Sequence, residues 1–329
     1  TALANYLAGD MVTDAKSNPT ITPSTSETFP LIGSQKTFYA TQQFFPEKPF
    51  NILVNVELLN PFIHKSLELA LQVLIKRHDA LRLAFKMTEE GPMQYVMDDI
   101  KSSIEFCKYQ SHQELINIED KLVNEVFDWE NPPYFKLVHI TGPENSSLIL
   151  IMHHLIFDAW SIYLIVNDLT DIYNKILKGV QQKNVENEYI FKDFVNQNKN
   201  INSVDKINKD KAYWIEDLND ATWGIALPYR QKIESKSNYK MVTGELNKTR
   251  TKELIEFNQE NKISIFHALL AGLFMTLNQQ SGRKDMIIRI ANANRDNSYP
   301  EIESLTGCLA DALPIRVKIE DEDNLVSVA

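Results

Sequence analysis

The chain is organised around one segment, Ser147-Leu-Ile-Leu-Ile-Met-His153-His154-Leu-Ile-Phe-Asp158-Ala-Trp-Ser161. Its opening run of apolar β-forming residues is typical of a strand that is buried on both faces of a sheet. After Asp158 the apolar residues recur with a helical period as far as Ile172, and Ser161 is expected to cap that helix. The sequence therefore predicts that a rigid strand and the N-terminus of a helix lie on either side of His153 and His154.

The spacing of these polar residues indicates chemistry only weakly when it is taken alone. A histidine four residues before an aspartate is common by chance, and a second histidine before it makes the pattern rarer. A buried histidine pair whose ring nitrogens are satisfied by the backbone has the same appearance in a sequence. Other segments of the chain must therefore separate a catalytic site from a structural one.

The segment His153-His154-Leu-Ile-Phe-Asp158-Ala-Trp-Ser161 resembles the His-His-x-x-x-Asp-Gly motif of condensation domains from nonribosomal peptide synthetases. Arg77-His-Asp-Ala-Leu-Arg82-Leu-Ala-Phe85 is similar to the family's Arg-His-Glu-x-Leu-Arg-x-x-Phe segment. Four further segments resemble family motifs and follow the family's order: Phe29-Pro-Leu-Ile-Gly-Ser-Gln35, Phe191-Lys-Asp-Phe194, Ala291-Asn-Ala-Asn-Arg295 and Gly307-Cys-Leu-Ala-Asp-Ala-Leu-Pro-Ile-Arg316.

The resemblance implies an α/β (α+β) fold like that of chloramphenicol acetyltransferase, in which two subdomains form a V with a cleft for the substrates. The second subdomain is expected to be incomplete at Ala329. The implied reaction is amide bond formation between a carrier-bound acyl or peptidyl thioester and a carrier-bound aminoacyl acceptor. Carrier domains are the implied partners, and they deliver both substrates on 4′-phosphopantetheine arms. No cofactor or metal bound by the chain itself is implied.

The resemblance also implies roles for individual residues. His154 matches the functional second histidine, which acts either as a base toward the attacking amine or as a group that orients it. His153 is expected to turn away and to support the end of the strand. Asp158 is expected to pair with an arginine and to fix the loop, and the resemblance nominates Arg295 as that arginine.

The chain departs from the family pattern at several positions. Ala159 stands where the family has glycine, so its methyl group is expected to narrow the substrate channel. Trp160 and Ser161 follow it and are expected to support the site. Later in the chain, Arg289 and Asn294 stand where the family has glycine, and Asp311 stands where it has asparagine.

Arg77 and Arg82 have a structural interpretation as well as a functional one. The first lies with His78 at the predicted end of a helix, where a positive charge complements the helix dipole. Arginines near the wall of an active site also hold buried carboxylates. We expect Arg77, His78 and Arg82 to be structural rather than catalytic.

Composition limits the function classes. The net charge of −10 argues against nucleic acid or an anionic membrane as a partner. No apolar run approaches the length of about 18 residues that a membrane span needs, and the N-terminus lacks the pattern of a signal peptide. Two cysteines, Cys107 and Cys308, provide neither a disulfide framework nor a zinc site. These features predict a cytoplasmic protein.

We divide the chain into three parts. Residues 1–27 are expected to hold a helix and a linker, which resemble the tail of a carrier domain or are simply a frayed terminus. Residues 28–185 form the subdomain with the histidine motif, and residues 186–329 form part of the second subdomain. The boundary falls in the polar run from Lys178 to Asn187.

Periodicity predicts the elements around the motif. A helix is expected to begin at Asn60-Pro61, with an apolar stripe that includes Ile63. A long helix capped by Ser264 is expected to be central to the second half, because its apolar stripe is wide. Strands are predicted over 51–58, 93–97, 104–106, 134–140, 239–246, 285–290 and 313–319, and further helices over 113–126, 161–177, 189–196, 206–218 and 249–259.

Rival functions share parts of the pattern. Heterocyclisation domains have Asp where this chain has His153, and plant-type acyl-CoA transferases carry an Asp-Phe-Gly-Trp-Gly run that is absent here. Epimerisation domains share the histidine pair and need a late acidic residue. A catalytically idle relative that only docks carrier proteins is favoured by Ala159 and disfavoured by the intact His154 and Asp158. Epimerisation and the idle scaffold remain open alternatives.

Overall fold

The computed structural model describes residues 28–58, 62–143, 145–180, 190–201, 204–221, 224, 227, 243–295 and 301–329. The chain separates into two compact units. Unit 1 comprises Thr1–Ser203 and Ala291–Asp311, and unit 2 comprises Val204–Ile290 and Ala312–Ala329. The helix and linker predicted over 1–27 lie outside the described residues, as does most of the polar run in which we placed the boundary.

A four-stranded sheet forms the centre of unit 1, in the order β2 (Asn51–Leu58), β7 (Ser146–His153), β6 (Phe135–Thr141) and β5 (Ile104–Lys108). Strand β7 is antiparallel to both of its neighbours, and β5 is parallel to β6. All residues of β7 after Ser146 are buried, which confirms the strand buried on both faces. The register places His153 opposite Asn51, so the histidines lie where β2 begins.

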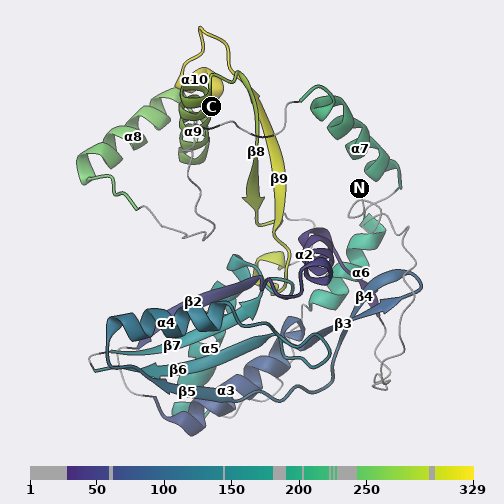
Figure 1. Ribbon diagram of the computed structural model, residues 1–329, viewed down its shortest axis with the longest axis vertical. Helices are drawn as coiled ribbons and strands as arrows, with labels where there is room; N and C mark the ends of the chain where they lie inside the picture. The colour runs from purple at the N-terminus through teal and green to yellow at the C-terminus, as the bar shows by residue number, and fades with distance from the viewer. Residues whose placement is uncertain are drawn as a thin grey trace. The chain divides into compact units, whose positions relative to one another are not determined.

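Helices cover both faces of this sheet (Figure 1). Helix α4 (His112–Val123) lies over one face, and α3 (His64–Arg77) and α5 (Ala159–Leu177) lie over the other. The predicted start of α3 at Asn60-Pro61 is wrong, because the helix begins at His64 after an extended Ile63. Ile63 is 57% exposed and does not join the buried stripe of Leu67, Ala70, Leu71, Leu74 and Ile75.

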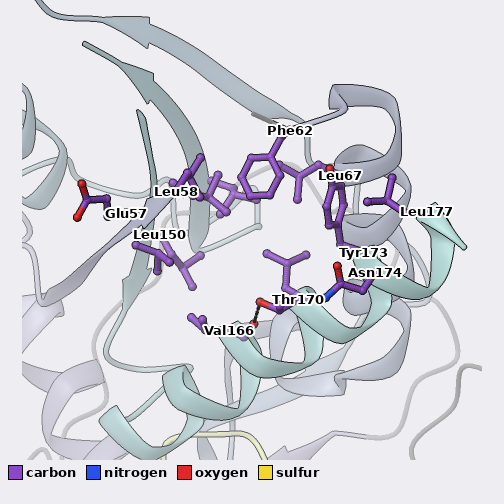
Figure 2. A pocket seen from close by; sticks show the side chains of 14 residues that line it. Glu57, Leu58, Phe62, Leu67, Leu150, Val166, Thr170, Tyr173, Asn174 and Leu177 are labelled. Carbon is purple, nitrogen blue, oxygen red and sulfur yellow. Dashed lines mark hydrogen bonds between the residues drawn. The ribbon is translucent and has the colours of Figure 1, made fainter. Parts of the chain in front are cut away.

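An apolar pocket of about 430 Å³ lies between the sheet and α5 (Figure 2). Leu58 of β2 and Leu148 of β7 belong to its wall, and both lie at the end of the sheet opposite His153. The hydroxyl of Thr170 donates to Val166 O at 2.8 Å, so this polar group of the lining is already satisfied. The pocket is therefore separate from the histidine motif.

A smaller sheet in unit 1 has the order β1 (Phe29–Pro30), β4 (Gly91–Val96), β3 (Leu83–Thr88), and a 3-10 turn, η1 (Asp79–Arg82), leads into it. The buried carboxylate of Asp79 accepts hydrogen bonds from the backbone N–H groups of Phe191 and Lys192, at 3.0 and 2.9 Å. Because these groups open α6 (Phe191–Ile201), Asp79 ties the Arg77–Arg82 segment to the segment that begins at Phe191.

Unit 2 contains α7 (Val204–Leu218), α8 (Lys248–Asn261), α9 (Ile265–Ser281), α10 (Leu325–Val328), and most of the two paired strands β8 (Asp285–Asn292) and β9 (Asp311–Lys318). Ser264 caps α9 as predicted, since its side chain accepts from His267 N. Much of the predicted central stripe is exposed, with Leu269 at 58% and Phe266 at 53%. Residues 243–246 are not in a strand, and the rest of the strand predicted over 239–246 lies outside the described residues.

Within the described ranges, no helix has the length and apolar character required to cross a membrane.

Candidate functional site

The side chain of His153 is fully engaged by the protein. Its Nδ1 accepts a hydrogen bond from Leu155 N at 3.0 Å, so the proton of the neutral ring lies on Nε2. Nε2 lies 3.3 Å from Oε1 of Gln42, whose amide nitrogen donates to Pro46 O. Both ring nitrogens are thus used inside the fold, and burial together with the neighbouring His154 lowers the pKa of His153 to about 3.

The low pKa of His153 predicts a pH-dependent stability. In the unfolded chain His153 has its ordinary pKa of 6.5 and binds a proton below that pH, whereas in the folded chain it binds a proton only near pH 3. The stabilisation that a neutral His153 provides is therefore complete above pH 6.5 and is lost as the pH falls toward 3. Between pH 7 and pH 4.5 the loss is about 2 to 3 kcal/mol. Urea unfolding of wild type and His153→Gln across this range measures it. Parallel pH dependences in the two proteins would rule out a neutral buried His153.

His154 follows the end of β7 and is half-buried. Its backbone N–H donates to Phe50 O at 2.7 Å, which extends the pairing with β2 by one residue. Its imidazole stacks on the ring of Phe38, with centroids 4.4 Å apart and planes inclined by 26°. Among the residues that the structure describes, no partner hydrogen-bonds the buried Nδ1 of His154. His154 is therefore positioned by its backbone hydrogen bond and by ring stacking. Unlike His153, it does not have both ring nitrogens engaged by described residues.

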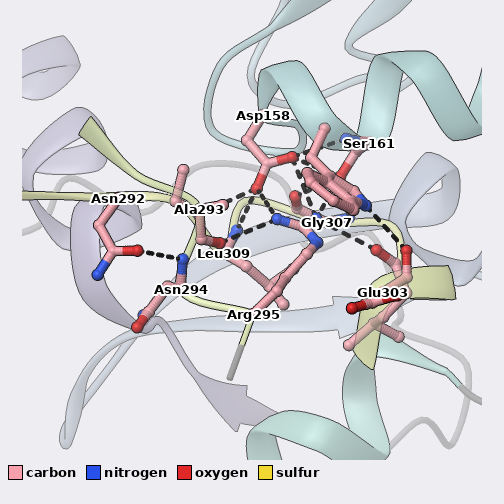
Figure 3. A network of polar contacts seen from close by, with 12 residues as sticks. Asp158, Ser161, Asn292, Ala293, Asn294, Arg295, Glu303, Gly307 and Leu309 are labelled. Carbon is pink, nitrogen blue, oxygen red and sulfur yellow. Dashed lines mark hydrogen bonds and ion pairs between the residues drawn. The ribbon is translucent and has the colours of Figure 1, made fainter. Parts of the chain in front are cut away.

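Asp158 is the centre of a buried polar network (Figure 3). Arg295 Nη1 donates to its Oδ2 at 2.9 Å, and Nη2 donates to its Oδ1 at 3.2 Å. The backbone N–H groups of Leu309 and Ala310 also donate to Oδ2, at 3.1 and 3.0 Å. Burial alone would raise the pKa of Asp158, but the hydrogen bonds and charge of Arg295 and the hydrogen bonds of Ser161 lower it. The lowered pKa keeps this carboxylate ionised at neutral pH, and it is paired with Arg295, the arginine that the resemblance nominated.

Ser161 does not cap α5, and the prediction that it does is wrong. The N-cap is Asp158, whose Oδ1 accepts from Ser161 N at 2.8 Å. The Ser161 hydroxyl lies in the same network, 2.7 Å from Asp158 Oδ1, 2.8 Å from Gly307 O and 3.0 Å from Arg295 Nη2. Asp158 and Ser161 together therefore fasten the returning segment Ala291–Asp311 to the start of α5.

Glycine is required at position 307 by close packing. A Cβ there would lie 2.3 Å from the ring of Phe191, and the residue has φ +153°. Asn294, for which the resemblance suggests a glycine position, has φ +55°, a left-handed conformation that asparagine tolerates better than most residues. Asparagine is therefore compatible with the turn before Arg295.

Trp160 and Ala159 occupy the exposed first turn of α5. The indole N–H of Trp160 donates to Glu303 O at 2.8 Å, and the guanidinium of Arg295 lies 5.5 Å from the ring centre. Trp160 therefore supports the same network from outside. Ala159 has no positive φ, so its methyl group causes no backbone strain.

Arg77 and Arg82 lie apart from the Asp158 network. Arg77 Nη1 is 3.4 Å from Asp168 Oδ2, and His78 Nε2 is 2.7 Å from the same oxygen. Arg82 donates to two backbone carbonyl oxygens, those of Ile75 and Met97, at 3.1 and 2.5 Å. These contacts support the structural interpretation of the segment, in which α3 is joined to its neighbours.

Helix α2 (Gly33–Phe44) supplies contacts that sequence reasoning missed. Phe38 and Gln42 contact one histidine each, and Gln35 Nε2 donates to Leu155 O at 3.0 Å. The resemblance marked Gln35 without giving it a role. The spacing of Gln35, Phe38 and Gln42, which places them on one helical face, is the signal that was available.

Solved structures with the same fold include condensation and epimerisation domains. The starter condensation domain of rhizomide synthetase superposes with a TM-score of 0.76 at 18% identity, covering 92% of this chain and 69% of that one. The epimerization domain from the third module of tyrocidine synthetase B gives a TM-score of 0.78 at 18% identity, covering 94% and 72%. The fold is thus the one that the resemblance implied, the mixed α/β architecture of the chloramphenicol acetyltransferase type.

Residues 25–329 match the family model of the condensation domain, and the chain belongs to that family. It is 26% identical to bacitracin synthase 2 of Bacillus licheniformis over 308 residues, 92% of this chain. It is 24% identical to gramicidin S synthase 2 of Brevibacillus brevis over 305 residues, 90% of this chain. The chain spans only 11% of the length of the first synthase and 6% of the second. It is a condensation domain of the nonribosomal peptide synthetase type.

Proposed function

We propose that this domain forms an amide bond between an acyl or peptidyl thioester donor and an aminoacyl acceptor, each carried on a partner carrier domain, and that His154 is its catalytic residue. The observation that carries the proposal is the contrast between the two histidines. His153 has both ring nitrogens occupied inside the fold, whereas His154 is held by its backbone and by one ring face. The loop that runs from His154 to the start of α5 is held in place by the ion pair of Asp158 and Arg295.

The acyl transfer needs a neutral amine and a place for the charge that develops on oxygen. The amine nitrogen attacks the thioester carbonyl carbon, a C–N bond forms, the C–S bond breaks, and the thiolate leaves and takes up a proton. We assign to Nε2 of His154 the hydrogen bond with the attacking amine, because Nδ1 is buried. In this role His154 removes the proton or orients the lone pair toward the carbonyl carbon.

His153, Asp158 and Arg295 act in this proposal as supporting groups. His153 fixes the strand end, and the Asp158–Arg295 pair fixes the loop that follows His154. The two carrier domains bring the 4′-phosphopantetheine arms, and we place the reaction in the cytoplasm. No cofactor held by the chain itself takes part.

An amide-forming assay of wild type and Ala159→Gly distinguishes this proposal from an idle scaffold that only docks carriers. Ala159→Gly removes an exposed methyl group from the first turn of α5, so turnover with bulky donors is expected to stay unchanged or to rise. The free energy of unfolding should fall by about 0.5 to 1 kcal/mol through added backbone entropy. Product is measured by mass spectrometry for both proteins against the same set of loaded donors. A scaffold gives no amide with either protein, although the carriers still bind.

A further inference from the structure

The orientation of the His154 imidazole plane has to come from the groups around the ring. Rotation about the Cβ–Cγ bond of histidine has broad minima, so hydrogen bonds or packing must select the ring orientation. The backbone bond from His154 to Phe50 O fixes the main chain and leaves the ring free to turn. In the part of the chain that the structure describes, the buried Nδ1 forms no hydrogen bond that would hold the ring.

The ring of Phe38 supplies the missing restraint. Phe38 stacks on the imidazole at 4.4 Å and 26°, and the ring of Phe50 lies 5.6 Å from the ring of Phe38. Phe38 is itself half-buried and lies on α2, one turn after Gln35 and one turn before Gln42. Phe50 therefore supports the phenyl ring against which the imidazole lies.

Helix α2 is anchored to the loop that carries His154. The amides of Gln35 and Gln94 bond each other reciprocally at 2.9 and 3.0 Å, and Gln35 also donates to Leu155 O. Gln42 lies beside the ring of His153. Because one end of this helical face is tied to the loop and the other end lies against the last residue of β7, Phe38 has a fixed position relative to His154.

We propose that Phe38 is a positioning residue for His154, and that its ring selects the imidazole orientation in which Nε2 meets the acceptor amine. The inference rests on the proposed function, because it concerns the same histidine. Stacked aromatic pairs contribute beyond their buried area, and a reacting group that is displaced slightly loses much of its rate. An aliphatic side chain at position 38 fills space and does not favour one ring plane.

The test compares Phe38→Leu with Phe38→Tyr in the amide-forming assay. Phe38→Leu is expected to lower kcat by about three- to tenfold with little change in KM for either loaded carrier, because the loss concerns orientation rather than binding. Phe38→Tyr retains the stacked ring and should recover kcat. Phe44→Leu is the matched control, since Phe44 is an aromatic residue on the same helix that is 42% exposed. It should leave kcat unchanged.

A second measurement does not depend on turnover. The ring protons of His154, assigned by their disappearance in His154→Gln, should carry an upfield ring-current shift that Phe38→Leu removes and Phe38→Tyr retains. Wild-type kcat in Phe38→Leu, or His154 signals that do not move, would overturn the role of Phe38 alone. A wild-type protein that forms no amide while its His154 signals respond to Phe38→Leu would instead overturn the proposed function.

Discussion

Replacing Asp158 by alanine is expected to lower the free energy of unfolding by about 3 to 5 kcal/mol, because it leaves a buried charge without its partner. The Arg295 side chain is 2% exposed, so solvent cannot replace the carboxylate. The substitution also removes the cap of α5 and the acceptor for the N–H groups of Leu309 and Ala310. Urea unfolding measures the effect.

The matched control for Asp158→Ala is Asp171→Ala on the same helix. Asp171 pairs with Lys175, but their side chains are 52% and 45% exposed, and such surface pairs contribute about 0 to 1 kcal/mol. Because the pKa of Asp158 is lowered in the folded chain, its contribution is present above the ordinary carboxyl value of 3.8 and is lost as the pH falls through the folded value. Equal stabilities of Asp158→Ala and wild type at pH 7 would show that the pair does not hold the fold.

His154→Ala is expected to lower turnover by about two to four decades, which is the range that a positioned acid–base group supplies. The fold should persist, because His154 is half-buried and its backbone bond to Phe50 O remains. Far-UV circular dichroism and the unfolding midpoint serve as controls for folding. Turnover equal to that of wild type would remove His154 from the mechanism.

His154→Gln distinguishes the two roles that remain for this residue. Glutamine retains a hydrogen-bonding side chain of similar length and cannot act as a base near neutral pH. If His154 mainly orients the amine, His154→Gln should retain much more activity than His154→Ala. If it accepts the proton, the two variants should be equally slow at pH 7, and His154→Gln should gain rate as rising pH deprotonates the amine in solution.

The sequence predicted the local architecture of the site because the signals are periodic and close together. The buried strand, the histidines at its end and the helix after Asp158 follow from apolar spacing within one segment. The cap of α5 was misplaced because aspartate and serine are both good caps, and Asp158 and Ser161 lie three residues apart. The start of α3 was misplaced because Asn-Pro is a general signal for a helix start that tertiary context overrides.

The contacts that complete the site were not predictable from spacing. Gln42 and His153 are 111 residues apart in sequence, and Asp158 and Leu309 are 151 apart. Such contacts depend on the sheet register and on the return of the chain to unit 1, which no local pattern encodes. Arg295 was nominated only because its surrounding motif resembles that of a family, and the exposed face of α9 shows that an apolar stripe alone does not establish burial.

The most direct test of the account is a single-turnover reaction between an acyl-loaded donor carrier and an aminoacyl-loaded acceptor carrier, followed by intact-protein mass spectrometry. With wild-type protein, the acyl group should move to the acceptor carrier as an amide, and His154→Ala should slow this transfer by about two to four decades. An acceptor carrier that keeps its original mass with every donor tested, while both carriers stay loaded and bound, would contradict the claim that this domain is a peptide-bond-forming enzyme.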